Sequence, residues 1–283
     1  MALHLDDKKA QSIGSWQECF VPDLTKRVQK AKKRITGPLE ICLERARAEI
    51  KAYEQYKNDP RIIQRARVFE TYLREKTVNI LEDELIVGNI TSKVRGQAFS
   101  GEVMSSFMSA ELDDPERDFS TRPYDPFIIP PEEREELRQV ILPYFKNKTH
   151  GDYAMSKLDD ELKEKAYMGL ASCTHIPNVG DPSMMRDAGH QIANYEKVLY
   201  KGLKGIREEV MMNMAQIDEP YMHFGKESKR DFYTAVLISL DAAIEYAGRY
   251  ADKAKEIAAQ EIDPVRKKEL QRIAEVCEQV PAN

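Results

Sequence analysis

The feature that most constrains the fold is a long helical pattern towards the C-terminal end of the chain, from Ser228 to Ala259. One side of this segment, in helical projection, carries Phe232, Val236, Ser239, Ala243, Tyr246 and Tyr250. A face of this kind needs another element to cover it. The pattern predicts a long amphipathic helix in a mainly α-helical protein with a few short strands.

A helical hairpin is predicted near the start of the chain. Residues 39–56 carry one apolar stripe, which indicates an amphipathic helix. The stripe consists of Ile41, Ala46, Ile50 and Tyr53. A second helix is expected over 61–76, because Pro60 suits a first-turn position. A short polar turn joins the two helices.

Four further helices are predicted from start signals and periodicity. Pro131 and the acidic residues after it favour a helix over 132–145, where the helix dipole stabilises negative charge. Asn194 reads as an N-cap, and Asp263 with Pro264 opens a last helix. The expected spans are 132–145, 157–170, 198–214 and the segment that begins at Pro264.

Two stretches break the helical pattern. Leu85, Ile86 and Val87 end at Gly88 and predict a short buried strand, followed by an irregular passage through Gly96 and Gly101. Residues 113–131 contain five prolines and predict a long loop. Such a loop is either a binding or interface segment or a packed surface strap.

Composition excludes several classes of function. The 283-residue chain has 32% charged residues and a formal net charge of −5, so nucleic acid is not an expected partner. Its longest apolar runs are far shorter than the ~20 residues that span a bilayer, and its start lacks the pattern of a secretory signal. We therefore expect a cytoplasmic protein without a membrane partner.

The chain is expected to consist of an N-terminal arm, residues 1–37, and one large domain, residues 38–283. The basic run 26–34 in the arm indicates a solvated helix face. The four cysteines, Cys19, Cys42, Cys173 and Cys277, have no metal-binding spacing. Each is interpreted as a buried packing residue, with a reactive thiol at Cys173 as the alternative.

Polar side chains gather in a bendable stretch before one of these helices. Gly180, Pro182 and Gly189 interrupt regular structure around Arg186, His190 and Gln191. Polar groups on a loop braced by a helix predict one wall of a ligand site. The alternative is that Arg186 is a solvated charge and that His190 bonds a backbone carbonyl.

Several blocks of the sequence resemble the N-terminal part of glycyl radical enzymes of the pyruvate formate-lyase-like group. They are ICLERARAEI at 41–50, RARVFETYL at 65–73, EDELIVGNITSKVRGQAFS at 82–100, STRPYDPF at 120–127, AGHQIANYEKVL at 188–199 and RIAEVCEQVPAN at 272–283. The closest likeness is to the branch of diol dehydratases, choline trimethylamine-lyase and sulfonate sulfite-lyases. The resemblance implies a ten-stranded α/β barrel, to which this portion contributes helical wrapping and one wall of the pocket.

In that family a C-terminal glycine holds the radical and a cysteine in a G-C-x-E loop passes it to substrate. Neither motif occurs in this sequence, so the resemblance implies a truncated or split portion that is inactive alone. It also implies a radical-SAM activating enzyme as partner, a homodimer when full length, and an anaerobic cytoplasm. No cofactor or metal is expected to be bound by this portion itself.

The resemblance further implies what the predicted wall contacts. His190 aligns with a histidine that faces a substrate hydroxyl in diol dehydratases, and Arg186 with an arginine that holds a sulfonate. An imidazole can bond a hydroxyl and a guanidinium fork suits a multi-oxygen anion. The expected substrate is 2,3-dihydroxypropane-1-sulfonate, cleaved at its carbon–sulfur bond to release sulfite. The alternatives are isethionate cleavage, glycerol or propanediol dehydration, and a helical binding module without chemistry.

Overall fold

The computed structural model describes residues 25–116, 118–121, 126–149, 152–153, 156–161, 193–217 and 226–283. Its backbone contacts divide the chain into two units, 1–37 and 38–283, and each is described by itself. In the first unit, α2 (Lys26–Ile35) begins at Thr25, whose Oγ1 accepts a hydrogen bond from Val28 N at 3.3 Å. None of the ten residues of α2 is buried.

The second unit contains a small parallel sheet. Its strands are β1 (Leu39–Cys42), β2 (Gly96–Ala98) and β3 (Phe127–Ile128), in the order β2-β1-β3. Glu40 pairs with Gly96 on one side of β1 and with Ile128 on the other. The prediction of a helix from Leu39 is wrong at this end, because residues 39–42 form the central strand and bury Ile41 and Cys42.

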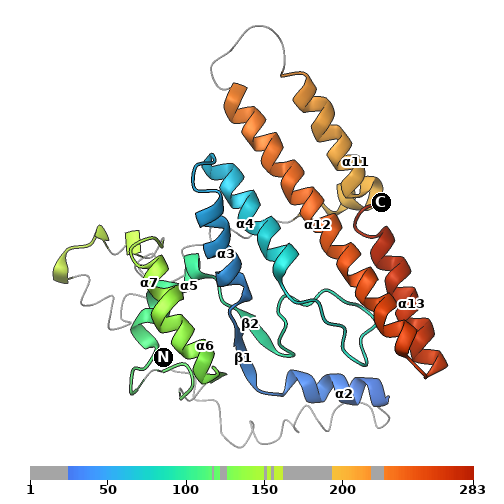
Figure 1. The fold of residues 1–283 in the computed structure, drawn as a ribbon, viewed down its shortest axis with the longest axis horizontal. Coiled ribbons are helices and arrows are strands. Elements are labelled where there is room, and N and C mark those ends of the chain that lie inside the picture. Colours follow the sequence, from blue (N-terminus) through green and yellow to red (C-terminus); the bar gives the residue numbers. More distant parts are fainter. Residues whose placement is uncertain are drawn as a thin grey trace, which may run out of the picture. The chain divides into compact units, whose positions relative to one another are not determined.

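The predicted hairpin is present as α3 (Glu44–Gln55) and α4 (Arg61–Glu75), which pack side by side (Figure 1). Pro60 lies at the N-cap of α4, one residue before its first turn. Gln64 closes the connection, since its Nε2 donates to Tyr56 O and Lys57 O, each at 3.0 Å.

The next helical segments of the second unit lie around a buried apolar cluster, which is called the first core below. They are α5 (Gly101–Glu111), α6 (Pro131–Glu136), the π-helical segment η1 (Leu137–Ile141) and α7 (Leu142–Phe145). Pro131 occupies the first turn of α6 with Glu132 and Glu133, as predicted. The core beneath them is built from Ile41, Leu43, Phe99, Met108, Leu137 and Ile141.

Three long helices complete the second unit: α11 (Tyr195–Ala215), α12 (Lys226–Gln260) and α13 (Pro264–Gln279). Helix α12 packs against α4, α11 and α13 (Figure 1). The predicted caps are confirmed, because Asn194 accepts from Lys197 N and Asp263 accepts from Val265 N, each at 3.0 Å. Of the predicted span 157–170, only 157–161 lies within the described residues.

The predicted buried face of α12 is shifted. Phe232 is exposed, whereas the buried positions are mainly small: Ala235, Ile238, Ala242, Tyr250, Ala251, Ala254 and Ala258. Ala235 and Ile238 pack with Ala66 of α4, and Ala254 and Ala258 pack with Leu270 and Ile273 of α13. Small residues of α12 therefore supply most of its buried contacts. An apolar stripe in the sequence does not show whether a helix is buried along its large or its small apolar residues.

The strand predicted at 85–87 is wrong. Residues 85–88 lie in a loop, and Ile86 is 91% exposed. Gly88 has φ of 124°, which takes the backbone out of the extended path. The run is apolar because it borders the groove described below, and apolar composition alone does not separate a buried strand from a loop of this kind.

The cysteines follow the prediction in part, and the methionines lie in different surroundings. Cys42 is buried and Cys277 is half-buried, while Cys19 and Cys173 lie outside the described residues. Met108 is fully buried, but Met211 and Met212 are exposed on α11. Among the residues that the structure describes, no group of three His, Cys, Asp or Glu side chains could hold a metal ion.

No helix in the described ranges is both long enough and apolar enough to cross a membrane.

Candidate functional site

The predicted ligand wall cannot be placed. Arg186, His190 and Gln191 all lie outside the described residues, as does Cys173. The described part of the chain begins again at Ala193. Residues 192 and 193 lie between Gln191 and Asn194, which is the N-cap of α11. What the structure shows is therefore the helix that follows the predicted wall, and a groove on the second unit.

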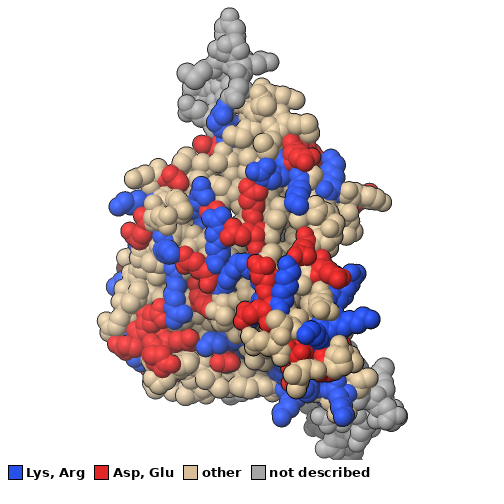
Figure 2. All heavy atoms as spheres, turned by 45° about the vertical axis from the view of Figure 1, so that its right-hand side comes forward, with Lys and Arg blue, Asp and Glu red and all other residues tan. Residues whose placement is uncertain are grey.

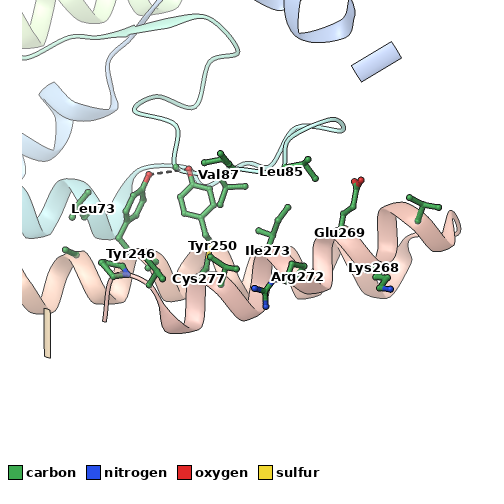
Figure 3. Close-up of a pocket in the computed structure, with 18 of the residues that line it drawn as sticks. Leu73, Leu85, Val87, Tyr246, Tyr250, Lys268, Glu269, Arg272, Ile273 and Cys277 are labelled. Carbon is green, nitrogen blue, oxygen red and sulfur yellow. Dashed lines mark hydrogen bonds between the residues drawn. The ribbon is translucent and has the colours of Figure 1, made fainter. Parts of the chain in front are cut away.

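The groove has a volume of about 1150 Å³ and runs between α4, α12, α13 and the loop at 85–88. Figure 3 shows its lining, with Leu85 and Val87 from the loop facing Ile273 and Cys277 from α13. Lys268, Glu269 and Arg272 also belong to the lining. A concave surface dominated by aliphatic and aromatic side chains suits apolar groups.

Two tyrosines contribute hydroxyl groups at one end of the groove. Tyr246 and Tyr250 lie one turn apart on α12, with ring centroids 5.2 Å apart and planes at 84°. Their hydroxyl oxygens are 3.3 Å apart (Figure 3). Burial raises the pKa of both phenols, so both remain neutral hydrogen-bonding groups at ordinary pH.

Behind Tyr246 lies a buried lysine. Lys76 is 2% exposed, and its Nζ donates to Tyr246 Oη at 2.6 Å and to Asn89 O. The ammonium also lies 4.9 Å from the ring centroid of Tyr246 and 5.5 Å from that of Tyr72. Within the described part of the chain no carboxylate forms an ion pair with it. Burial lowers the pKa of Lys76, and the carbonyl, hydroxyl and ring faces replace the lost water.

The loop at 81–90 includes the groove-lining residues 85–88. Its backbone is held by hydrogen bonds from side chains and not by pairing with a neighbouring strand. Arg266 of α13 donates to Leu81 O at 3.0 Å and to Glu84 O at 2.7 Å. Tyr72 donates to Ile90 O, and both Lys76 and Tyr246 donate to Asn89 O. Because buried backbone carbonyls need donors, these contacts allow a loop to keep one conformation without pairing.

This arrangement was not predicted from the sequence. Tyr246 and Tyr250 belonged to the predicted stripe of α12, but nothing marked Lys76 or Arg266, because lysine and arginine are usually solvated. The groove is a candidate binding surface.

Comparison with known proteins identifies the family. Residues 19–283 match the model of the family described as pyruvate formate lyase-like. The chain belongs to this family.

Its relatives include enzymes that act on sulfonates. The chain is 31% identical to isethionate sulfite-lyase of Desulfovibrio desulfuricans, over 90% of this chain and 30% of that protein. It is 30% identical to (2S)-3-sulfopropanediol dehydratase of Klebsiella oxytoca, over 86% of this chain and 28% of that protein. The chain thus spans about 30% of the length of these relatives.

Solved structures give the same picture of the fold. The glycerol-bound B12-independent glycerol dehydratase of Clostridium butyricum aligns with a TM-score of 0.78 and 30% identity, covering 92% of this chain and 31% of that one. A glycyl radical enzyme of Archaeoglobus fulgidus aligns with a TM-score of 0.76 and 28% identity, covering 91% of this chain and 31% of that one. The mainly helical fold with a small parallel sheet is therefore that of part of a glycyl radical enzyme chain, as predicted.

Proposed function

We propose that this chain is the N-terminal portion of a glycyl radical lyase that cleaves the carbon–sulfur bond of 2,3-dihydroxypropane-1-sulfonate. The products are sulfite and hydroxyacetone, which together contain every atom of the substrate. The observation that carries the proposal is that the sequence contains both Arg186 and His190, four residues apart, in a family whose members include a sulfite-lyase and a sulfopropanediol dehydratase.

Arg186 is assigned to the sulfonate group. A guanidinium stays charged at any working pH and presents several N–H donors in a plane, which suits an anion with three oxygens. His190 is assigned to a substrate hydroxyl, because an imidazole can donate to it or accept from it. Gln191 is adjacent and supplies an amide that can do the same.

The reactive groups are assigned to the rest of the protein. No cysteine of this chain stands in a G-C-x-E sequence. A protein glycyl radical, installed by a radical-SAM activating enzyme, would supply the hydrogen abstraction that starts the reaction. This portion contributes recognition: it holds the anionic group and one hydroxyl, and it functions within a longer protein that is proposed to be a homodimer.

The experiment measures steady-state kinetics of full-length variants after activation. Arg186→Ala should raise KM for the sulfonate about thirtyfold, since losing the partner of a buried anion costs about 2 kcal/mol or more. Arg61→Ala is the matched control, because Arg61 is exposed in the first turn of α4. An unchanged KM in the Arg186 variant would reject the sulfonate assignment.

The same kinetic assay distinguishes between the candidate substrates. His190→Ala should impair turnover of the dihydroxy sulfonate more than turnover of isethionate, which lacks the additional hydroxyl. Equal losses would argue against the hydroxyl role and favour isethionate as substrate. Activity on glycerol or propanediol with no dependence on Arg186 would favour a dehydratase.

A helical binding module without chemistry is the second candidate, because the described residues offer an apolar groove and no metal cluster. The reading frame beyond Asn283 discriminates between the two. A G-C-x-E sequence followed much later by R-V-x-G-Y supports the enzyme. Without them, a sharp cooperative melt of this chain alone would support the module.

A further inference from the structure

Helix α11 contains a sharp interruption at Gly202. This residue has φ of 62° and ψ of 173°, inside a segment that is otherwise helical from Tyr195 to Ala215. That backbone conformation is accessible essentially to glycine alone. The helix therefore consists of two halves, 195–201 and 203–215, that meet at a corner.

An ion-pair clamp crosses the corner. In a straight helix Lys197 and Glu209 would lie about 18 Å apart along the axis, because each residue adds about 1.5 Å. Here Lys197 Nζ is 2.8 Å from Glu209 Oε1, and Lys201 Nζ is 2.8 Å from Oε2. Hydrogen bonds from Lys197 and Lys201 lower the pKa of Glu209 to about 2, so the carboxylate is charged near neutrality.

The residues at 281–283 lie directly against the corner. Leu203 N donates to Pro281 O and Lys204 N donates to Ala282 O, each at 2.9 Å. These N–H groups begin the second half of the helix and have no partner within it. A Cβ at position 202 would lie 2.6 Å from Ala282 O. Figure 1 shows this end of the chain beside α11.

The two halves are supported differently. The second half packs on α12 through the buried Val210 and through an ion pair of 2.7 Å between Arg207 Nε and Asp241. The first half has little apolar packing, since Leu199 and Tyr200 are each 83% exposed. The direction of the first half therefore depends on the corner: on Gly202, on the clamp and on the carbonyls at 281–282.

We propose that this corner is the mount of the substrate-contact segment, with Glu209 and Gly202 as positioning residues. The inference rests on the proposed function, which assigns substrate contacts to Arg186, His190 and Gln191. The last of these precedes the N-cap of the first half by three residues. Glu209 touches no substrate in this assignment, and it acts by fixing the half-helix that carries the segment.

Amide hydrogen exchange of the full-length protein tests the mount directly. Glu209→Gln keeps the size of the side chain but removes its charge, and exchange in residues 195–201 should become about fivefold faster. Asp241→Asn is the matched control. This variant removes the ion pair between Asp241 of α12 and Arg207, which lies on α11 like Glu209. The corner keeps its own contacts, so exchange in 195–201 should be unchanged.

A charge reversal tests the pairing. Glu209→Lys should accelerate exchange in 195–201 more than Glu209→Gln, because three cations then meet at the corner. Adding Lys197→Glu and Lys201→Glu to this variant should restore slow exchange. No change in the Glu209→Gln variant, an equal change in the Asp241→Asn variant, or a failure of the reversal to restore protection would each overturn the clamp.

Kinetics separate this inference from the proposed function. Glu209→Gln should raise KM for the sulfonate several-fold with kcat unchanged, because binding geometry is loosened while the reacting groups are untouched. If Arg186→Ala raises KM and Glu209→Gln does not, the positioning role is overturned and the substrate assignment stands. If neither variant changes KM, the proposed function fails, whatever the exchange experiment shows.

Discussion

At the scale of single residues, Glu49 shows how the protein holds a buried carboxyl group. Glu49 is fully buried, and its carboxylate accepts from Ser100 Oγ and Gly101 N at 2.7 Å each and from Arg45 Nε at 2.9 Å. It thereby caps the first turn of α5, where the helix dipole favours negative charge. Burial nevertheless raises the pKa of Glu49, so desolvation outweighs these donors.

Gly101 gives a test at this scale. A Cβ there would lie 2.0 Å from Cε2 of Phe145, whose ring is buried in the first core. Gly101→Ala should therefore lower the free energy of unfolding by about 1–3 kcal/mol, measured by urea denaturation.

The matched control for that test is Gly248→Ala in the middle of α12. Nothing lies within 4 Å of a Cβ built at Gly248. Alanine in a helix interior is favoured over glycine, so this variant should gain up to about 1 kcal/mol. A loss of stability in both variants would show that the space around Gly101 is not the cause.

At the scale of elements, the loop after α5 is held by ion pairs. Arg134 of α6 contacts Asp118 through Nη1 at 2.7 Å and Nη2 at 2.9 Å, and it contacts Asp113 at 2.6 Å. Arg138 adds two further hydrogen bonds to Asp113. The prediction of one long loop over 113–131 is wrong at its end, because Phe127–Ile128 form β3 and Pro131 begins α6.

The ion pairs predict a pH dependence. The bonds to Arg134 hold the pKa of Asp118 well below its ordinary value, and those to Arg138 and Arg134 lower the pKa of Asp113. Because both carboxyls are more acidic in the folded state, their stabilisation is present above the ordinary Asp pKa of about 3.9 and is lost as the pH falls below it. Asp118→Asn should flatten the decline of unfolding free energy between about pH 4 and pH 2. An unchanged slope would contradict this role.

At the scale of the whole second unit, the described residues form three apolar clusters. The first contains Ile141 and another contains Leu270, both fully buried, and a third packs Ala66 of α4 against Ala235 and Ile238 of α12. Helix α4 links them, because Arg74 pairs with Glu245 of α12 at 2.7 Å and Arg249 donates to Lys76 O at 2.8 Å. The unit is therefore expected to unfold as one.

Replacing a large core residue by alanine tests whether the second unit unfolds in a single transition. Ile141→Ala and Leu270→Ala should each destabilise by about 2–5 kcal/mol. Both should move the same single transition in a calorimetric scan. Two separate transitions, each shifted by only one of the variants, would contradict it.

Charge is distributed without a dominant sign on the face shown in Figure 2, where Lys and Arg alternate with Asp and Glu. Many charged side chains of the described residues are paired, as between Lys255 and Glu278 and between Arg272 and Glu275. Exposed pairs of this kind contribute little to stability, so the apolar clusters carry most of it.

What the sequence determined by itself is local. The caps at Asn194 and Asp263, the proline in the first turn of α6 and the long helix α12 all follow from neighbours in the chain, and all are confirmed. The family could also be recognised from sequence blocks. The assignment of Arg186, His190 and Gln191 stays a prediction, because these residues lie outside the described part of the chain.

Tertiary structure decided the rest, because those outcomes depend on partners far away in sequence. Residues 39–42 became a strand because Gly96–Ala98 and Phe127–Ile128 pair with them, and Leu85 to Val87 became a groove wall because Arg266 and Lys76 supply donors to that loop. Gly202 became a corner because Glu209 and the carbonyls at 281–282 meet there. Local propensity cannot encode such partners, and burial of their polar groups requires them.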